Sequence, residues 1–217
     1  MTPRSLLFSP AISDYVLAHT EPPDDVMTAL IAETADMAEV SMQIGPDQAA
    51  FMALLVRAVN AKRAIEIGTF TGLSALSVAR ALPEDGSLLC CDINAEWTSI
   101  ARRYWEQAGV SERIELRLGP AAQTLEDLPA EPTFDFAFVD ADKTGYKGYV
   151  DALYPRMHTN ALVLLDNVLR GGRVLAQSEA SADDEAVIAL NDQLITDRRW
   201  ETVLLPLADG LTLLRKR

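Results

Sequence analysis

Short apolar runs alternate with longer segments of helical periodicity from residue 63 onward. The apolar runs predict five strands, at 63–67, 87–92, 113–118, 134–139 and 161–166. Apolar residues at helical spacing predict the intervening and following helices, at 72–82, 95–108, 120–128, 145–156 and 182–197. Because strands and helices alternate in this way, we expect right-handed crossovers and a mostly parallel sheet in an α/β fold.

Both ends of the chain depart from this alternation. Two apolar strands meet at Asp209-Gly210, a dipeptide that favours a tight turn, so an antiparallel hairpin is expected at the sheet edge. Before the sheet, the pattern predicts only helices, at 10–19, 23–37 and 46–60, the last with an apolar stripe of Phe51, Leu54, Leu55 and Ala58. We therefore expect one domain over 1–217, with a helical extension at 1–60 and the α/β core at 61–217. Such added helices either cover a ligand crevice or form a subunit contact, and the pattern does not distinguish these uses.

The composition excludes several classes of function. With 49% hydrophobic residues the chain can bury a good core, whereas its formal charge of −13 opposes binding to nucleic acid. No apolar segment is long enough to span a membrane, and the run within residues 1–8 is too brief for a signal peptide. Cys90 and Cys91 are adjacent in a predicted strand, so they face opposite sides and form no disulfide framework. These features are typical of a cytoplasmic protein.

A glycine turn follows the first predicted strand, in the stretch 63–72. Gly68 lets the chain approach a ligand where the next helix begins, which is the position of the nucleotide crevice in open parallel sheets. Asp92 ends the following strand about 20 residues later, where an acid usually binds ribose hydroxyls. The stretch predicts a nucleoside-containing ligand, although Gly68 and Gly72 also fit a plain turn.

The neighbouring acid bears on which nucleoside binds. Gly68 and Gly72 do not complete the three-glycine dinucleotide fingerprint, and the carboxylate of Glu66 repels phosphate and attracts a cation. S-adenosylmethionine fits this field, because it carries adenosine hydroxyls for Asp92, a sulfonium, and an amino group for Glu66. An NAD-dependent dehydrogenase is the alternative for an acid placed like Asp92.

Acids also end two later strands. Asp140 follows the strand 134–139, and Asp166 with Asn167 ends the strand 161–166. If these strands are neighbours, the three side chains converge with oxygen donors only, which favours Mg²⁺, Ca²⁺ or Mn²⁺ over zinc. The alternative is that each acid caps the segment that follows it.

Several co-linear motifs together resemble one family, the cation-dependent catechol and caffeoyl-coenzyme A O-methyltransferases. The similar segments are Ala61–Ser74, Gly119–Ala121, Phe134–Lys143, Leu165–Asn167 and Asp209–Thr212. The resemblance implies a Rossmann-like sheet of seven strands, mostly parallel, with helices on both faces. It also implies a homodimer.

The resemblance assigns roles to individual positions. It implies that the S-adenosylmethionine site is lined by Met42, Glu66, Gly68, Thr69, Ser74, Asp92, Ala121 and Asp140. It gives the divalent cation, Mg²⁺ first among the candidates, to Asp140, Asp166 and Asn167, and the catalytic roles to Lys143 and Asp140. Trp97 is similar to an aromatic residue near the adenine, although packing of its helix explains it equally well.

The expected reaction is methyl transfer to one hydroxyl of a small aromatic vicinal diol of the catechol, hydroxycinnamate or flavonoid type. A cation that chelates both oxygens favours ionisation of a phenol, and Lys143, if neutral, takes the proton. Arg170 and Gly171 depart from the family at acceptor-side positions, and the long insertion of plant enzymes is absent, so the coenzyme A ester is not the expected acceptor. A binding protein that has lost catalysis remains an alternative.

Overall fold

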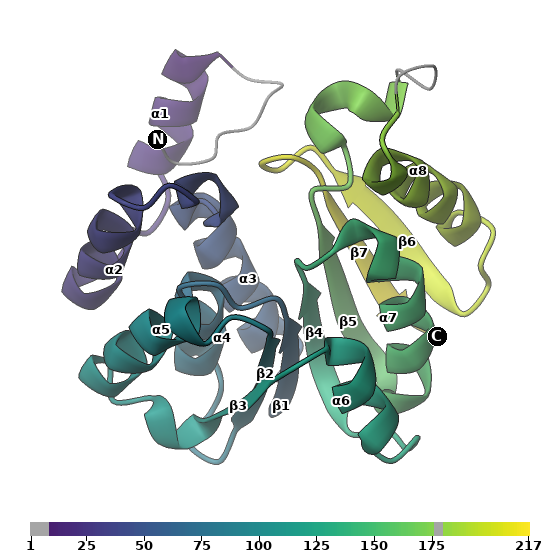
Figure 1. Ribbon diagram of the computed structural model, residues 1–217, viewed down its shortest axis with the longest axis horizontal. Coiled ribbons are helices and arrows are strands. Elements are labelled where there is room, and N and C mark those ends of the chain that lie inside the picture. Colours follow the sequence, from purple (N-terminus) through teal and green to yellow (C-terminus); the bar gives the residue numbers. More distant parts are fainter. Residues whose placement is uncertain (1–8, 176–179) are drawn as a thin grey trace.

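The computed structural model describes residues 9–175 and 180–217; the predicted absence of a signal peptide concerns residues 1–8, which lie outside these ranges. A seven-stranded sheet forms the centre, in the order β3-β2-β1-β4-β5-β7-β6 (Figure 1). The strands are β1 Arg63–Ile67, β2 Ser87–Asp92, β3 Ile114–Leu118, β4 Phe134–Val139, β5 Met157–Asp166, β6 Trp200–Leu205 and β7 Leu211–Lys216. β1 to β5 pair in parallel, and β7 joins β5 and β6 antiparallel, as the hydrophobic pattern predicted.

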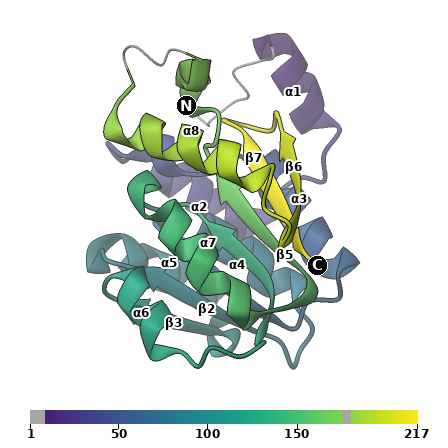
Figure 2. The ribbon, with the colours of Figure 1, turned by 90° about the vertical axis from the view of Figure 1, so that its right-hand side faces the viewer.

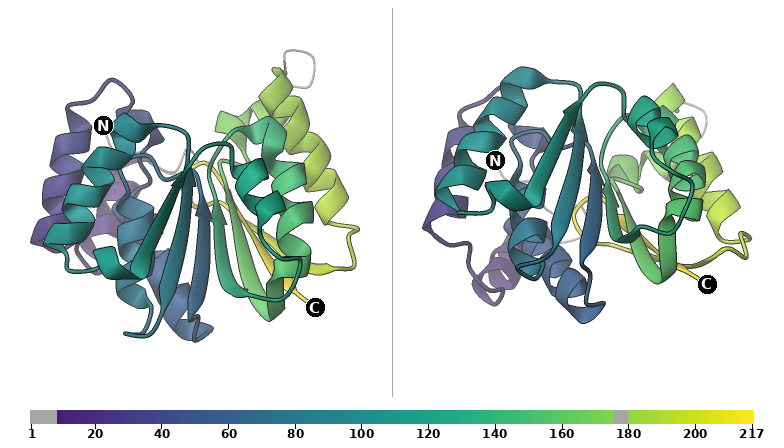
Figure 3. Two further views of the ribbon diagram at one scale, coloured as in Figure 1. Left: turned by 60° about the horizontal axis from the view of Figure 1, so that its bottom comes forward. Right: turned by 90° about the horizontal axis from the view of Figure 1, so that it is seen from below.

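Helices cover both faces of the sheet (Figures 2 and 3). One side carries α2 Asp25–Ala35, α3 Pro46–Ala58, α4 Leu73–Ala81 and α5 Ala95–Gln107, with α1 Pro10–Ala18 beyond them. The other side carries α6 Ala121–Asp127, α7 Tyr146–Leu153 and α8 Ala182–Leu194. Within the described residues, none of the helices has the length and apolarity needed to cross a membrane.

Two apolar cores lie on the two faces. Successive residues of β1 alternate between them: Ala64 packs on the side of α3 and α4, whereas Ile65 and Ile67 pack on the side of α7 and α8. Cys90 and Cys91 divide in the same way and are both buried free thiols, which confirms that they face opposite sides. The sheet is thus buried on both faces, and its loops at the strand ends remain available for a site.

The stripe predicted for the third helix is right for Phe51 and Leu55, which pack against the core, and wrong for Leu54 and Ala58, which are exposed. The buried face of α3 consists of Gln48, Ala49, Met52 and Val56, whereas Leu54 is 61% exposed. The prediction followed the largest apolar residues, while the helix turns its smaller ones and a glutamine toward α4 and the sheet. This brings part of the helical extension to the ends of β4 and β5.

β5 and the hairpin also differ in detail from the prediction. β5 begins at Met157 and contains an irregular register against β4, with Asn160 at positive φ, so its polar start did not look like a strand. Residues 206–210 connect β6 to β7, a longer loop than the predicted tight turn. In that loop Gly210 adopts φ 87°, and its main chain accepts a hydrogen bond from the Val168 amide. The hairpin therefore holds the segment that follows Asp166.

Candidate active site

The glycine turn after β1 is packed too closely for a side chain. Gly68 has φ 90°, and a Cβ there would lie 2.0 Å from the main-chain oxygen of Asp140. Gly72 has φ 86°, and a Cβ there would lie 2.6 Å from Cβ of Ala101. Glycine is required at both positions, because of the positive φ and because a Cβ would collide with neighbouring atoms. Gly68 thereby lets the ends of β1 and β4 come into contact.

Asp92 braces this turn. Its Oδ2 accepts hydrogen bonds from the main-chain amides of Thr69 and Phe70, both at 2.8 Å, and Oδ1 accepts one from Asn94 at 2.8 Å. These bonds hold the loop against the end of β2, and they leave part of the acceptor capacity of the carboxylate open to the cavity that it lines. Its contact with ribose hydroxyls stays a prediction.

A cavity of about 420 Å³ lies against the turn. Its walls include Met42, Gly68, Thr69, Asp92, Trp97, Ala121 and Asp140, and a smaller adjoining pocket is lined by Met42, Gly68, Ser74 and Asp140. Trp97 also packs edge-on against Phe70, with their ring centroids 5.2 Å apart. Its position therefore agrees both with a place near the adenine and with packing of its helix. All the predicted cofactor residues except Glu66 line one or both pockets. We call the larger one the cofactor-side cavity.

Glu66 lies beneath the turn, 1% exposed. Burial raises the pKa of its carboxyl to about 8. Among the described residues neither Glu66 Oε2 nor Thr69 Oγ1 has a hydrogen-bond partner, although both atoms are buried. Two orphaned acceptors beside a cavity suit a ligand that carries an ammonium group, so the residues present fit the predicted cofactor.

A second cavity, of about 480 Å³, opens at the ends of β4 and β5. It is lined by Ser41, Met42, Gln43, Ile44, Gln48, Asp140, Ala141, Lys143, Asp166, Asn167, Ala208 and Asp209. We call it the acid-lined cavity. Met42, Asp140 and Ala141 line both cavities, so the two spaces meet at these residues.

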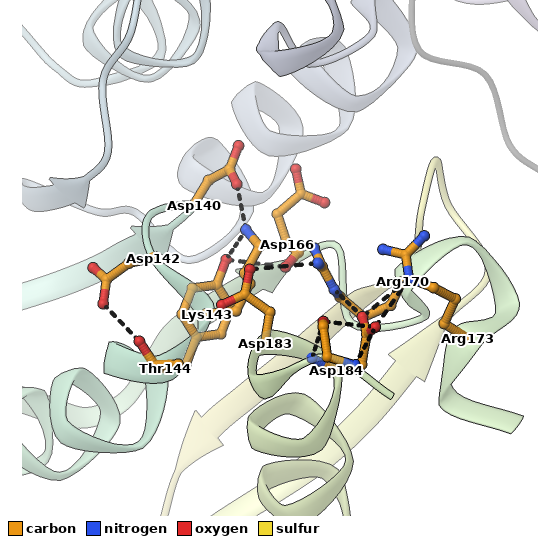
Figure 4. Close-up of polar contacts among 11 residues, drawn as sticks. Asp140, Asp142, Lys143, Thr144, Asp166, Arg170, Arg173, Asp183 and Asp184 are labelled. Carbon is orange, nitrogen blue, oxygen red and sulfur yellow. Dashed lines mark hydrogen bonds and ion pairs between the residues drawn. The ribbon is translucent and has the colours of Figure 1, made fainter. Parts of the chain in front are cut away.

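Lys143 is held between a carboxylate and a phenol (Figure 4). Its Nζ donates to Asp140 Oδ1 at 2.9 Å and to Tyr146 Oη at 2.7 Å, and it is 7% exposed. The hydroxyl of Tyr146 lies 3.0 Å from the carbonyl oxygens of both Val139 and Asp166. Because carbonyls only accept hydrogen bonds, the Tyr146 oxygen is left to accept from Lys143, which fixes the amine.

Asp166 and Asn167 end β5 at the same cavity. Asp166 Oδ1 accepts a hydrogen bond from the main-chain amide of Asn167, and Oδ2 accepts one from Gln48 Nε2, each at 2.8 Å. Burial and then the charge of Asp140 raise the pKa of Asp166 to about 7. Asn167 has φ 56°, an uncommon backbone conformation for a residue other than glycine, and such strain is concentrated at functional sites.

These residues fit a hard divalent cation. Asp140 and Asp166 follow neighbouring strands, and burial together with the charge of Asp140 raises the pKa of Asp166, an effect that positive charge between them would relieve. The described part of the chain has no cluster of three or more His, Cys, Asp or Glu side chains that could hold a metal, and Asn167 adds a side-chain amide to the two acids of this cavity wall. Neither Asp140 nor Asp166 caps a helix, contrary to the alternative reading.

Arg170 and Gly171, the two residues that depart from the family, make contacts that hold the local structure. Arg170 Nε donates to Asp184 Oδ1 at 2.9 Å, and Arg173 contacts the same carboxylate (Figure 4). Arg170 is not among the described residues that line the acid-lined cavity. The Gly171 main-chain amide donates to Asp209 Oδ1 at 2.6 Å. The guanidinium therefore holds the loop against α8.

Sequence reasoning missed two residues of this site. Tyr146 lies in the predicted helix after the Asp-Ala-Asp-Lys run, and its spacing of three from Lys143 was an available signal. Gln48 was hidden by the misassigned face of α3. A polar residue among Ala49, Met52 and Val56 would have been the signal, had that face been identified.

Comparisons with known proteins identify the family and the fold. The model of the O-methyltransferase family matches residues 18–217. The protein called "Probable caffeoyl-CoA O-methyltransferase 2" of Dictyostelium discoideum is 38% identical, with 96% of this chain and 93% of that protein covered. Caffeoyl-CoA O-methyltransferase 5 of Nicotiana tabacum is 37% identical, with 98% and 94% covered. The O-methyltransferase TomG of Streptomyces achromogenes, solved with S-adenosylmethionine, has a TM-score of 0.84 at 26% identity, with 95% and 96% covered.

Proposed function

The chain belongs to the O-methyltransferase family, and on this premise we propose that it is a divalent-cation-dependent enzyme that methylates one hydroxyl of a small aromatic vicinal diol, with S-adenosylmethionine as the donor. Family membership favours methyl transfer over both alternatives left open by the sequence, the NAD-dependent dehydrogenase and the non-catalytic binding protein. Substrate, cation and individual residue roles form the proposal.

One observation carries it: the cofactor-side cavity and the acid-lined cavity meet at Met42, Asp140 and Ala141. Methyl transfer needs the nucleophilic oxygen in line with the methyl carbon at roughly 3 Å. Two adjoining spaces, one with orphaned acceptors and one with paired acids, provide separate places for donor and acceptor on either side of that junction.

On the donor side, Glu66 and Thr69 bind the amino group of the cofactor, and Asp92 binds its ribose hydroxyls. S-adenosylmethionine supplies the methyl group as an electrophilic carbon on a sulfonium. Met42 lies at the junction and is 45% exposed, so it would pack against that end of the ligand. Gly68, Ser74 and Ala121 shape the surrounding wall.

On the acceptor side, Asp140, Asp166 and Asn167 hold the divalent cation. The cation supplies positive charge that favours ionisation of a chelated phenol and disfavours the ammonium form of a nearby amine. Lys143 in its neutral form takes the proton from the reacting hydroxyl, and Tyr146 keeps its Nζ at the cavity wall. The proton then resides on Nζ, next to Asp140.

The cavity suits a small acceptor. About 480 Å³ lies within the usual range for small-molecule sites of roughly 300–1,000 Å³. The relatives are named for a coenzyme A ester. We propose instead a free catechol, hydroxycinnamate or flavonoid, on the absence of the plant insertion. A homodimer is proposed on family resemblance alone, and a cytoplasmic location on the free thiols of Cys90 and Cys91.

The test is a methylation assay with labelled S-adenosylmethionine and pairs of acceptors that differ by one hydroxyl, such as a catechol and its monophenol. We expect label on the diol only, loss of activity in excess chelator, and recovery with Mg²⁺. Activity that persists in chelator contradicts the role of the cation. Equal activity on the monophenol contradicts chelation of two oxygens.

A further inference from the structure

Gln48 of α3 lies at the wall of the acid-lined cavity and is fully buried. Its Nε2 donates to Asp166 Oδ2 at 2.8 Å. In this contact the amide turns its NH₂ group toward Asp166. The orientation of the side chain, and hence the position of Oε1, follows from this contact.

The Oε1 atom of Gln48 has no hydrogen-bond partner among the described residues, although it is buried. Leaving such an acceptor unpaired is destabilising, so a group that satisfies it is expected. The nearby charges of Asp140 and Asp166 are negative, and the amine of Lys143 is already committed to Asp140 and Tyr146. This field favours a cation at Oε1 over a neutral donor.

We propose that Gln48 completes the cation site, with Nε2 holding Asp166 and Oε1 acting as a fourth protein oxygen beside Asp140, Asp166 and Asn167. The inference rests on the proposed cation dependence and adds a residue to it. Hard cations accept amide oxygens as readily as they accept carboxylates in mixed sets. Four protein oxygens in a six-coordinate ion leave two positions, which is the number of oxygens in a vicinal diol.

The proposal also gives a use to the helical extension. α3 precedes the sheet, and its only link to Asp166 among the described contacts is the amide of Gln48. Cation binding is thereby coupled to the docking of α3.

The test is calorimetric titration of the full-length chain with Mn²⁺, without cofactor or acceptor. Gln48→Met keeps a similar volume and removes both polar atoms, and we expect it to bind Mn²⁺ about tenfold more weakly or worse. Gln48→Glu supplies a carboxylate oxygen at the same place, so it should bind at least as tightly as the native chain. Gln43→Met is the matched control, because Gln43 is a buried glutamine of the same cavity wall and contacts Thr71 instead; its affinity should be unchanged.

The outcomes separate this inference from the proposed function. A native chain that binds no Mn²⁺ overturns both. If the native chain and Gln48→Met bind Mn²⁺ equally, Gln48 is not a cation ligand, and the proposed function still stands. The same holds if Gln48→Glu binds Mn²⁺ as weakly as Gln48→Met. Thermal unfolding without ion checks folding, and if Gln48→Met fails to fold, Gln48→Glu decides the question.

Discussion

The two cavities that meet at Met42 and Asp140 are built differently. The cofactor-side cavity is built around a glycine turn whose amides are held by Asp92, and the segments that follow β2, β3 and β4 complete its wall. The acid-lined cavity is shaped by charged and amide side chains from α3, the ends of β4 and β5, and the 206–210 loop. The first cavity is built around a main-chain cradle, the glycine turn at residues 68–72. The second is built around charged and amide side chains.

This difference predicts different sensitivities. Main-chain hydrogen bonds keep the cradle in shape without a ligand, so single side-chain changes there should affect mainly affinity. In the acid-lined cavity, burial and the charge of Asp140 raise the pKa of Asp166 to about 7. Changes there should affect mainly turnover.

The largest effect is expected at Lys143. Lys143→Met should lower kcat about 1,000-fold, because the proton acceptor is lost, while leaving the cofactor Kd nearly unchanged. Lys147→Met is the control, since Lys147 is exposed and pairs only with Asp151 among the described contacts. Steady-state kinetics and calorimetry measure both quantities. A variant that retains its rate would remove Lys143 from the mechanism.

Asp166→Ala should come next, with kcat lowered about 100-fold and the cofactor Kd changed little, because the residue lies only on the acid-lined side. Asp151→Ala, at an exposed acid of α7, is the control. An equal loss of turnover and of cofactor affinity would break the comparison between the cavities.

Glu66→Gln should give the opposite pattern. Losing the charged partner of the amino group should weaken S-adenosylmethionine binding about tenfold, while kcat at saturating cofactor stays near the native value. Calorimetry with the cofactor and saturation kinetics measure the two effects. A large loss of kcat with unchanged affinity for S-adenosylmethionine would contradict the role of Glu66 in binding the cofactor.

The smallest expected effect is on stability against pH. The pKa of Glu66 is about 8 in the folded chain and 4.5 as its ordinary value, so the folded state binds more protons between these limits. Stability of the ligand-free chain should therefore fall as pH rises from 5 to 8, lowering Tm by about 5 °C or more. Glu66→Gln should flatten part of this slope, and Asp166, whose pKa is raised to about 7, contributes the remainder with the same sign. An equally steep slope in the variant would contradict this.

The sequence predicted the cradle better than the acid-lined cavity, for a physical reason. Gly68, Thr69 and Asp92 sit at strand ends that apolar runs mark clearly, and short-range geometry then brings them together. The strand-end acids Asp140 and Asp166 were placed by the same logic, and both line the acid-lined cavity.

What the sequence did not reveal depends on long-range packing. Which face α3 buries is decided by α4 and the sheet, so periodicity alone chose Leu54 over Gln48. The start of β5 at Met157 likewise depends on pairing with β4, through an irregular register that no local pattern announces. The 206–210 loop binds the segment after Asp166 mostly by main-chain contacts, with the Asp209 carboxylate accepting from the Gly171 amide. Main-chain contacts leave no mark on residue type except at Gly210.

The contact of Gly68 with the carbonyl of Asp140 constrains how this enzyme can be altered. With no room for even a methyl group there, the cofactor-side cavity and the acid-lined cavity share one rigid joint and cannot be altered separately through it. Engineering for new acceptors is better directed at the far wall, where Ser41 and Ala208 border the cavity without touching that joint.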